Sequence, residues 1–235
     1  MGAGAIRAEH AWEITTGQNS NLIIAVLDTG MDTAHPDLHN RLFVNGAEIT
    51  GNGIDDDNNG YIDDYYGFNF VGATQTITGK WQSDPDFPQM FDLHGHGMWC
   101  ASIIGAEPNN NTFGAGIFWG GKILPVRIIG EADENRQVIG STTTVIEGVY
   151  YAVKMGAKII SMSFGSNQYD QLEEQALKYA NEKGCVLIAA AGNDNSNNND
   201  NKKYPACYDN IISVGASDAS DNRASFSNYG SSVHL

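Results

Sequence analysis

Short runs of apolar residues alternate along the chain with stretches in which apolar and polar residues follow a helical period. Apolar runs of this length, rich in Val, Ile and Leu and bounded by Gly, Asn or Asp, predict buried strands. The predicted strands are residues 22–27, 123–129, 159–164, 186–191 and 211–214. This alternation predicts an α/β fold of three layers, with a mainly parallel central sheet and helices on both faces.

Two amphipathic stretches predict helices, at residues 142–155 and 171–183, because each ends near a glycine that favours a helix C-terminus. Residues 52–89 and 194–203 are instead rich in Asn, Asp, Gly and Ser, which favour turns. Both segments lie between core-like elements, so we expect them to be surface loops. The length of 235 residues is then compatible with a single domain over residues 1–235.

Charge and composition exclude several kinds of partner. The formal net charge of −15 argues against nucleic acid, since a phosphate backbone is bound mainly by basic patches. No apolar run approaches the ~18 residues of a membrane span, so no membrane partner is expected, and residues 1–4 show no signal peptide. Three cysteines cannot all pair within one chain, so at least one thiol should be free, and a disulfide between Cys185 and Cys207 stays open.

Three polar side chains stand at the ends of predicted elements. Asp28 follows the first strand, His96 lies between two glycines before a run of small and apolar residues, and Asn193 follows the strand at 186–191. Functional groups of open α/β sheets emerge at the carboxyl ends of strands. An imidazole with a pKa near ~6.5 suits general base catalysis, and a side-chain amide can donate to a developing oxyanion.

Each of these residues also has an ordinary interpretation. Asp28 is compatible with a helix cap, His96 with a structural histidine or, together with His94, part of a metal pair, and Asn193 with a turn. The three signals in this order, each in its expected local context, are far more specific than any one alone.

The order of the short motifs resembles the subtilisin-like family of serine endopeptidases over essentially the whole chain. The motifs that carry the resemblance are Asp28-Thr29-Gly30, Gly95-His96-Gly97, Ser161-Met162-Ser163-Phe164-Gly165, Ala191-Gly192-Asn193 and Ser225-Phe226-Ser227. The resemblance implies an extracellular enzyme that hydrolyses peptide bonds of a polypeptide substrate. It implies that Asp28 orients His96, that His96 is the general base, and that Asn193 contributes to the oxyanion hole.

The same resemblance places the nucleophilic serine in a later Gly-Thr-Ser-Met-Ala motif, and no serine of this chain has that context. Residues 233–235 resemble a strand that leads to this motif. We therefore expect a peptidase catalytic domain that is incomplete at its C-terminal end, with a further C-terminal segment of the same protein as its partner. The alternative is a catalytically inactive, peptide-binding relative that keeps the substrate cleft.

Two segments resemble those that hold an extended substrate in this family, and strand addition of this kind gives affinity through main-chain hydrogen bonds. Their candidate contact residues are Ser163, Phe164, Gly165, Gly130 and Glu131. Together with Asp133 and Glu134, Glu131 would favour basic residues upstream of the cleaved bond. A solvated acidic loop is the alternative.

Five aspartates within residues 55–64 suggest a bound cation, and residues 55–63 follow the front of a calcium loop, with Gly60 at the sixth position. The usual twelfth-position glutamate is replaced by Tyr66, so another ligand must come from Asp64 or elsewhere. The predicted ligands of this structural calcium are Asp55, Asp57, Asn59, Asp63 and Asp64. A solvated acidic loop is again the alternative. From the family resemblance alone, Asp37 and the loop with Asn111 correspond to a second calcium site.

Overall fold

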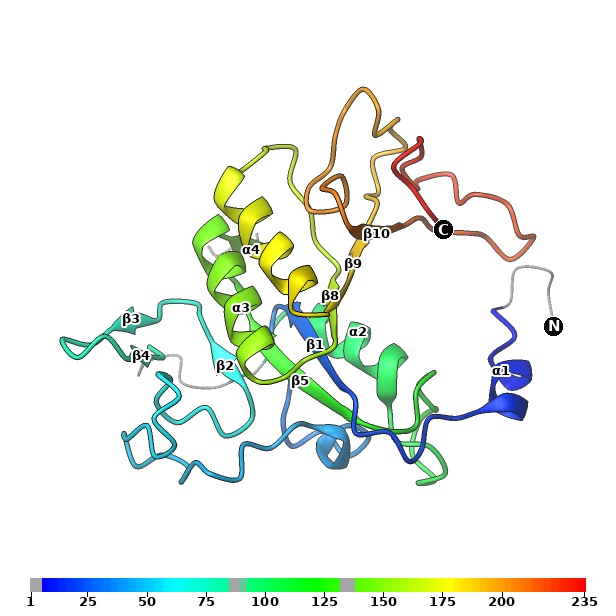
Figure 1. Cartoon of the computed structure of the whole chain (residues 1–235). Coiled ribbons are helices and arrows are strands. Elements are labelled where there is room, and N and C mark those ends of the chain that lie inside the picture. Colours follow the sequence, from blue (N-terminus) through cyan, green and yellow to red (C-terminus); the bar gives the residue numbers. More distant parts are fainter. Residues whose placement is uncertain (1–5, 85–89, 91, 132–137) are drawn as a thin grey trace.

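The computed structural model describes residues 6–84, 90, 92–131 and 138–235, and its centre is a six-stranded sheet (Figure 1). The strands follow the order β10-β9-β8-β1-β5-β2, and every neighbouring pair is parallel. Their bounds are β1 (Ile23–Asp28), β2 (Phe68–Asn69), β5 (Lys122–Arg127), β8 (Ile159–Met162), β9 (Val186–Ala190) and β10 (Ile211–Val214). All five predicted strands are therefore present, and the predicted parallel sheet is confirmed.

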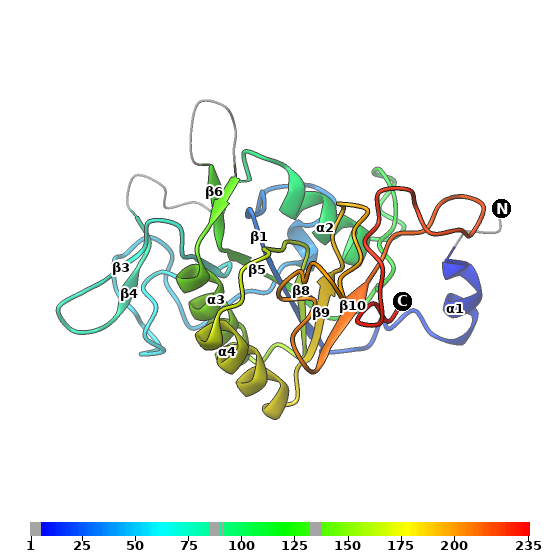
Figure 2. The ribbon, with the colours of Figure 1, turned by 90° about the horizontal axis from the view of Figure 1, so that it is seen from above.

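Helices cover both faces of this sheet, as predicted. Helices α3 (Thr142–Lys154) and α4 (Gln171–Glu182) lie on one face, and α2 (His96–Gly105) lies on the other (Figure 2). The Ser141 side chain caps α3 in a capping box with Thr144, and Asp170 caps α4 by accepting two backbone N–H bonds. Both helices end shortly before the glycines that the sequence pattern singled out.

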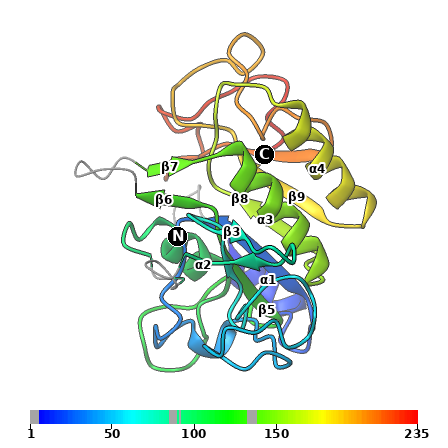
Figure 3. The same cartoon turned by 90° about the vertical axis from the view of Figure 1, so that its left-hand side faces the viewer.

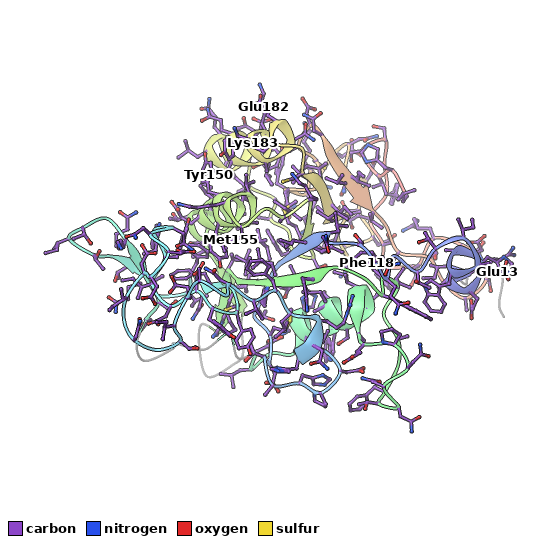
Figure 4. All side chains as sticks on the ribbon, turned by 60° about the horizontal axis from the view of Figure 1, so that its bottom comes forward. Glu13, Phe118, Tyr150, Met155, Glu182 and Lys183 are labelled. Carbon is purple, nitrogen blue, oxygen red and sulfur yellow. The ribbon has the colours of Figure 1, made fainter. Side chains whose placement is uncertain are left out.

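The main core lies between the sheet and the layer of α3 and α4. Leu27, Leu124 and Ile160 of the sheet and Val149 of α3 are fully buried in it. Burying a side chain of this size contributes about 1.5–3 kcal/mol, so this layer supplies much of the stability that positions the strand ends. The opposite side of the helical layer faces solvent, where Tyr150 and Glu182 project outward (Figure 4).

Several small elements surround the sheet. Two antiparallel hairpins pair β3 (Thr74–Gln75) with β4 (Trp81–Gln82) and β6 (Ile129–Glu131) with β7 (Val138–Gly140); the second is seen in Figure 3. The remaining elements are α1 (Ala8–Ile14) and the short 3-10 helix η1 (His39–Arg41). The predicted strand at 123–129 is thus two strands, because the chain leaves the main sheet at Ile128. Apolar residues stand on both sides of Arg127, so the sequence pattern gives no signal for that bend.

The three cysteines are free thiols, so the disulfide between Cys185 and Cys207 is not formed. The buried thiol of Cys185 instead donates to the Ala157 carbonyl oxygen, at 3.1 Å. Among the helices in the described part of the chain, none has both the length and the apolar character needed to cross a membrane.

Candidate active site

Asp28 is the last residue of β1, near the middle of the sheet, and its side chain is only 1% exposed. Neighbouring β5 and β8 run parallel to β1, so their carboxyl ends meet at the same edge of the sheet. The chain leaves β1 toward β2 on one side of the sheet and leaves the adjacent β8 toward β9 on the other, which makes this edge a topological switch point, where open α/β sheets bind ligands. The backbone N–H of Thr29 donates to Asp28 Oδ1 at 2.7 Å and fixes the carboxylate.

His96 is the first residue of α2, and two glycines place it against β1. Gly95, before the helix, has a φ of 90°, a left-handed conformation that L side chains rarely adopt. A Cβ at Gly97 would lie 2.3 Å from the carbonyl oxygen of Gly30, so only glycine allows the helix to approach this closely. The N–H of Gly97 donates to Thr29 Oγ1 at 2.9 Å, which ties the first turn of α2 to the end of β1.

These two elements bring Asp28 and His96 together, although they are 68 positions apart in the sequence. His96 Nδ1 lies 2.7 Å from Asp28 Oδ1, and the imidazole is 37% exposed while the carboxylate is buried. The hydrogen bond to Asp28, followed by the contact with Cys100, raises the pKa of His96 above its usual value, although burial acts in the opposite direction. With Nδ1 bound to the carboxylate, Nε2 is the nitrogen left to exchange a proton with a substrate-side group.

Cys100 follows His96 by one helical turn, and its Sγ lies 3.9 Å from His96 Nδ1. Donor atoms of Asp28, His96 and Cys100 all lie within 4.8 Å of one another. A soft metal ion bound by this thiol would therefore compete directly with the bond between the carboxylate and the imidazole.

A cavity of about 540 Å³ opens beside His96. Its lining includes Ser163, Phe164 and Gly165, which follow β8, and also Ile129 of β6. Of the predicted substrate-contact residues, Gly130 lies next to this lining in β6 but packs toward Val71. Glu131 belongs to β6 by its backbone. Asp133 and Glu134 lie outside the described residues, so the predicted acidic outer cleft stays a prediction.

Asn193 lies in the turn that follows β9, and its side chain is exposed. The buried side chain of Asn228 holds this turn, because its Oδ1 accepts the N–H groups of Asp194 and Ser196 at 2.8 and 3.1 Å. The strand order places the turn at the same edge of the sheet as Asp28, with β8 between them. Asn228 directly follows the Ser225-Phe226-Ser227 motif in the sequence, so the segment that carries this motif holds the turn after β9.

The acidic loop gathers carboxylates around a residue that the sequence pattern missed. Carboxylate oxygens of Glu48, Asp55 and Asp57 lie within 4.8 Å of one another. Glu48 is 4% exposed; its Oε1 accepts the N–H of Asp57 at 3.2 Å, while its Oε2 is buried and has no partner among the described residues. The Lys80 ammonium lies 2.9 Å from Asp55 Oδ2 and offsets part of the charge.

The other predicted ligands in this loop have different surroundings. Asn59 donates its side-chain amide to Asp57 and Asp64, at 3.2 and 3.0 Å. Asp64 is fully buried, accepts the Tyr151 hydroxyl at 2.9 Å, and has its pKa raised to about 6 mainly by burial. Asp63 turns away and accepts the N–H groups of residues 52 and 53, each at 3.0 Å.

The second predicted calcium site involves a buried aspartate, Asp37, which is 2% exposed. Its Oδ1 accepts the side-chain amide of Asn110 at 2.6 Å. Asn111, the predicted ligand, has a φ of 63° and an exposed side chain. Asn110 is therefore the loop residue that contacts Asp37.

Comparison with known proteins gives consistent matches. The sequence model of the Peptidase S8 family, described as the subtilase family, matches residues 19–235. Thermitase from Thermoactinomyces vulgaris is 35% identical over 234 residues, which cover 100% of this chain and 68% of thermitase. The major intracellular serine protease of Bacillus subtilis (strain 168) is 30% identical over 236 residues, with coverage of 100% and 62%.

Among solved structures, the psychrophilic subtilisin-like protease Apa1 from the Antarctic psychrotroph Pseudoalteromonas sp. AS-11 has a similar fold. It matches with a TM-score of 0.66 at 28% identity, over 94% of this chain and 42% of that one. The chain thus spans 42% to 68% of the length of these three proteins.

Proposed function

Because the chain belongs to the subtilase family, we propose that it forms the part of a serine endopeptidase that binds the substrate and carries Asp28, His96 and Asn193. The observation that carries this proposal is the bond of 2.7 Å between Asp28 Oδ1 and His96 Nδ1 at the carboxyl end of the parallel sheet. His96 lines a cavity that is large enough for substrate side chains.

In the proposed mechanism, His96 takes the proton of the attacking serine at Nε2 and later delivers it to the leaving amine. Asp28 keeps the proton of the neutral ring on Nδ1 and stabilises the imidazolium that forms. Asn193 donates its amide to the oxyanion of the tetrahedral intermediate, for which the exposed turn after β9 leaves room. The same roles are known for the subtilisins, so they come to this chain by family membership.

We further propose that the attacking serine lies outside residues 1–235, in a C-terminal segment of the same protein that completes one catalytic domain. Every serine of the chain lies in the described residues, and none of them hydrogen-bonds to the His96 ring. Ser141, Ser163 and Ser166 line the cavity beside His96 but make no such bond. This observation equally favours a second candidate, an inactive relative that binds peptides in the same cleft.

Substrate binding in this proposal uses the backbone of an extended polypeptide. Residues 163–165, which follow β8, line the cavity together with Ile129 of β6 and Gly140 of β7, and the hairpin of these two strands also contains Gly130 and Glu131. A peptide added as a strand between them would gain main-chain hydrogen bonds irrespective of its sequence.

A structural calcium ion bound by Glu48, Asp55 and Asp57 is also part of the proposal. The residues fit such an ion, because hard carboxylate oxygens converge there and Glu48 Oε2 is buried with no hydrogen-bond partner in the described part of the chain. An ion would neutralise carboxylates that otherwise repel one another. Asp37 with its neighbouring loop remains the second proposed site.

The extracellular location expected from the family resemblance stays a prediction, since one of the relatives described above is named as intracellular. Secretion of the full-length protein, followed with an antibody in cells and culture medium, tests it directly.

The endopeptidase proposal is tested by comparing two purified proteins on labelled casein. The 235-residue chain should bind but not hydrolyse it, and the full-length product of the gene should hydrolyse it in a manner abolished by His96→Ala. Hydrolysis by the chain alone that disappears in His96→Ala would place the nucleophile within residues 1–235. A full-length protein that binds casein without cleaving it would establish the inactive relative.

A further inference from the structure

The cavity beside His96 combines apolar walls with a single acid. Ile129, Val145 and Phe164 contribute apolar surface, and the remaining lining is mostly small and polar. Among the described residues that line it, Glu173 is the only carboxylate. The sequence pattern did not single out this residue.

Glu173 lies in the first turn of α4, where an acidic residue is ordinarily an exposed partner of the helix N-terminus. Its surroundings are different, because it is only 7% exposed. Its Oε2 accepts the Tyr208 hydroxyl at 3.1 Å, whereas Oε1 accepts no hydrogen bond from the described residues and is not sealed from solvent. The next residue, Glu174, lies nearer the surface and bonds to the Tyr169 hydroxyl, outside the cavity lining.

The carboxylate of Glu173 is only partly satisfied. The Tyr208 hydroxyl has one proton and lies within bonding distance of both Glu173 Oε2 and the Asp170 carbonyl oxygen, at 3.1 and 3.0 Å. Burial accordingly raises the pKa of Glu173 above its usual value. A cation that reached Oε1 would offset the lost hydration, and its attraction to the carboxylate would be stronger here than in bulk water.

We propose that Glu173 determines specificity, and that this cavity binds a lysine or arginine side chain of the substrate polypeptide. The aliphatic stem of such a side chain packs against Val145 and Phe164, and its charged end donates to Glu173 Oε1. The net charge of −15 favours the approach of basic peptides as well. This inference rests on the proposed binding of polypeptides in the same cleft.

The test uses the 235-residue chain and fluorescein-labelled octapeptides in a fluorescence anisotropy titration. One lysine is moved through the eight positions of an otherwise neutral peptide, and each peptide is matched by one with norleucine, which has a similar stem without the charge. At one position we expect lysine to bind about tenfold tighter than norleucine, as is usual for a charge-assisted hydrogen bond. Glu173→Gln should bring the ratio close to one, and the matched control Glu174→Gln should leave it unchanged.

The outcomes separate this inference from the function on which it rests. If no peptide binds at all, both are wrong. If peptides bind with no preference for lysine at any position, or if the preference survives Glu173→Gln, only the inference is wrong.

A second measurement needs no variant and so does not depend on how Glu173→Gln folds. A water-soluble carbodiimide joins a carboxylate and an amine in contact as an amide. With the preferred lysine peptide bound, mass spectrometry should find the crosslink on Glu173. A crosslink confined to other carboxylates would overturn the assignment.

Discussion

The close approach of α2 to β1 can be tested by adding one methyl group at Gly97. A Cβ there would lie 2.3 Å from the Gly30 carbonyl oxygen and 3.2 Å from Thr29 Oγ1, and the shortest tolerated contact is about 3.0 Å. The helix or the strand end must then retreat by about 0.7 Å, since the first contact is with backbone rather than with a flexible side chain.

The expected cost of Gly97→Ala follows from three contributions. Overpacking of this kind costs about 1–3 kcal/mol, and weakening of the bond from Gly97 N to Thr29 Oγ1 costs about 1 kcal/mol more. Alanine recovers up to about 1 kcal/mol through its higher helix propensity. We therefore expect a net loss of about 1–3 kcal/mol in the free energy of unfolding.

Urea denaturation followed by circular dichroism measures this loss, and NMR of the imidazole nitrogens reports on the site. Because His96 precedes Gly97 in the helix, the shift should lengthen its bond to Asp28 and lower the pKa of the ring. The matched control is Gly105→Ala in the same helix, where the nearest atom to the Cβ would be the movable Ile123 Cδ1 at 3.1 Å and the nearest backbone atom would lie at 3.5 Å. A Gly97→Ala chain as stable as the parent, with an unchanged His96 titration, would refute the argument.

Three further predictions concern the site and the acidic loop. Asp28→Asn should lower the pKa of His96 in an NMR titration, since the carboxylate is the main cause of its elevation. Because the pKa of His96 is raised in the native state, the pair of Asp28 and His96 stabilises the fold most at pH values below the pKa that the ring has in the unfolded chain. The stability gap between parent and variant in urea should therefore shrink as pH rises through the native pKa. In the full-length protein, Asn193→Ala should lower kcat about 100-fold or more with little change in KM, which is the magnitude known for subtilisin. A raised KM at unchanged kcat would show that Asn193 does not belong to the oxyanion hole. Calcium at 100 times its Kd should stabilise the chain by about 2.7 kcal/mol, and Glu48→Gln should abolish the rise in Tm while Asp63→Asn should keep it. A Tm that chelator leaves unchanged in the parent chain would contradict the calcium site.

The strands and long helices could be predicted because their patterns are local. Burial on both faces of a parallel sheet makes a continuous apolar run, and the amphipathic faces of α3 and α4 have the helical period. The short strands of the hairpins have no comparable signal, since two or three residues are too few to show a period. Because β6 has only three residues, the sequence pattern also did not show that the run at 123–129 divides between β5 and β6.

The candidate site was only partly predictable. Asp28 and His96 stand in recognisable motifs, but the sequence cannot show how β1 and α2 bring them to 2.7 Å. Glu48 precedes the acidic loop without any regular spacing, and its burial depends on how the chain folds back over Asp57. Glu173 has the sequence context of an ordinary first-turn glutamate, and the tyrosine that helps to bury it comes 35 positions later.

The position of β1 in the sheet also affects how the chain can reach this structure. Ile23 of β1 pairs with Lys122, 99 positions later, and Ile24 pairs with Ile159, 135 positions later. Closing such long segments costs chain entropy before any pairing is formed, and folds dominated by distant contacts form slowly. During synthesis the apolar strand 23–28 therefore leaves the ribosome long before either neighbour exists. We expect its burial, and with it the fixing of Asp28, to be among the late steps of folding, which makes the nascent chain vulnerable to aggregation until β8 has been made.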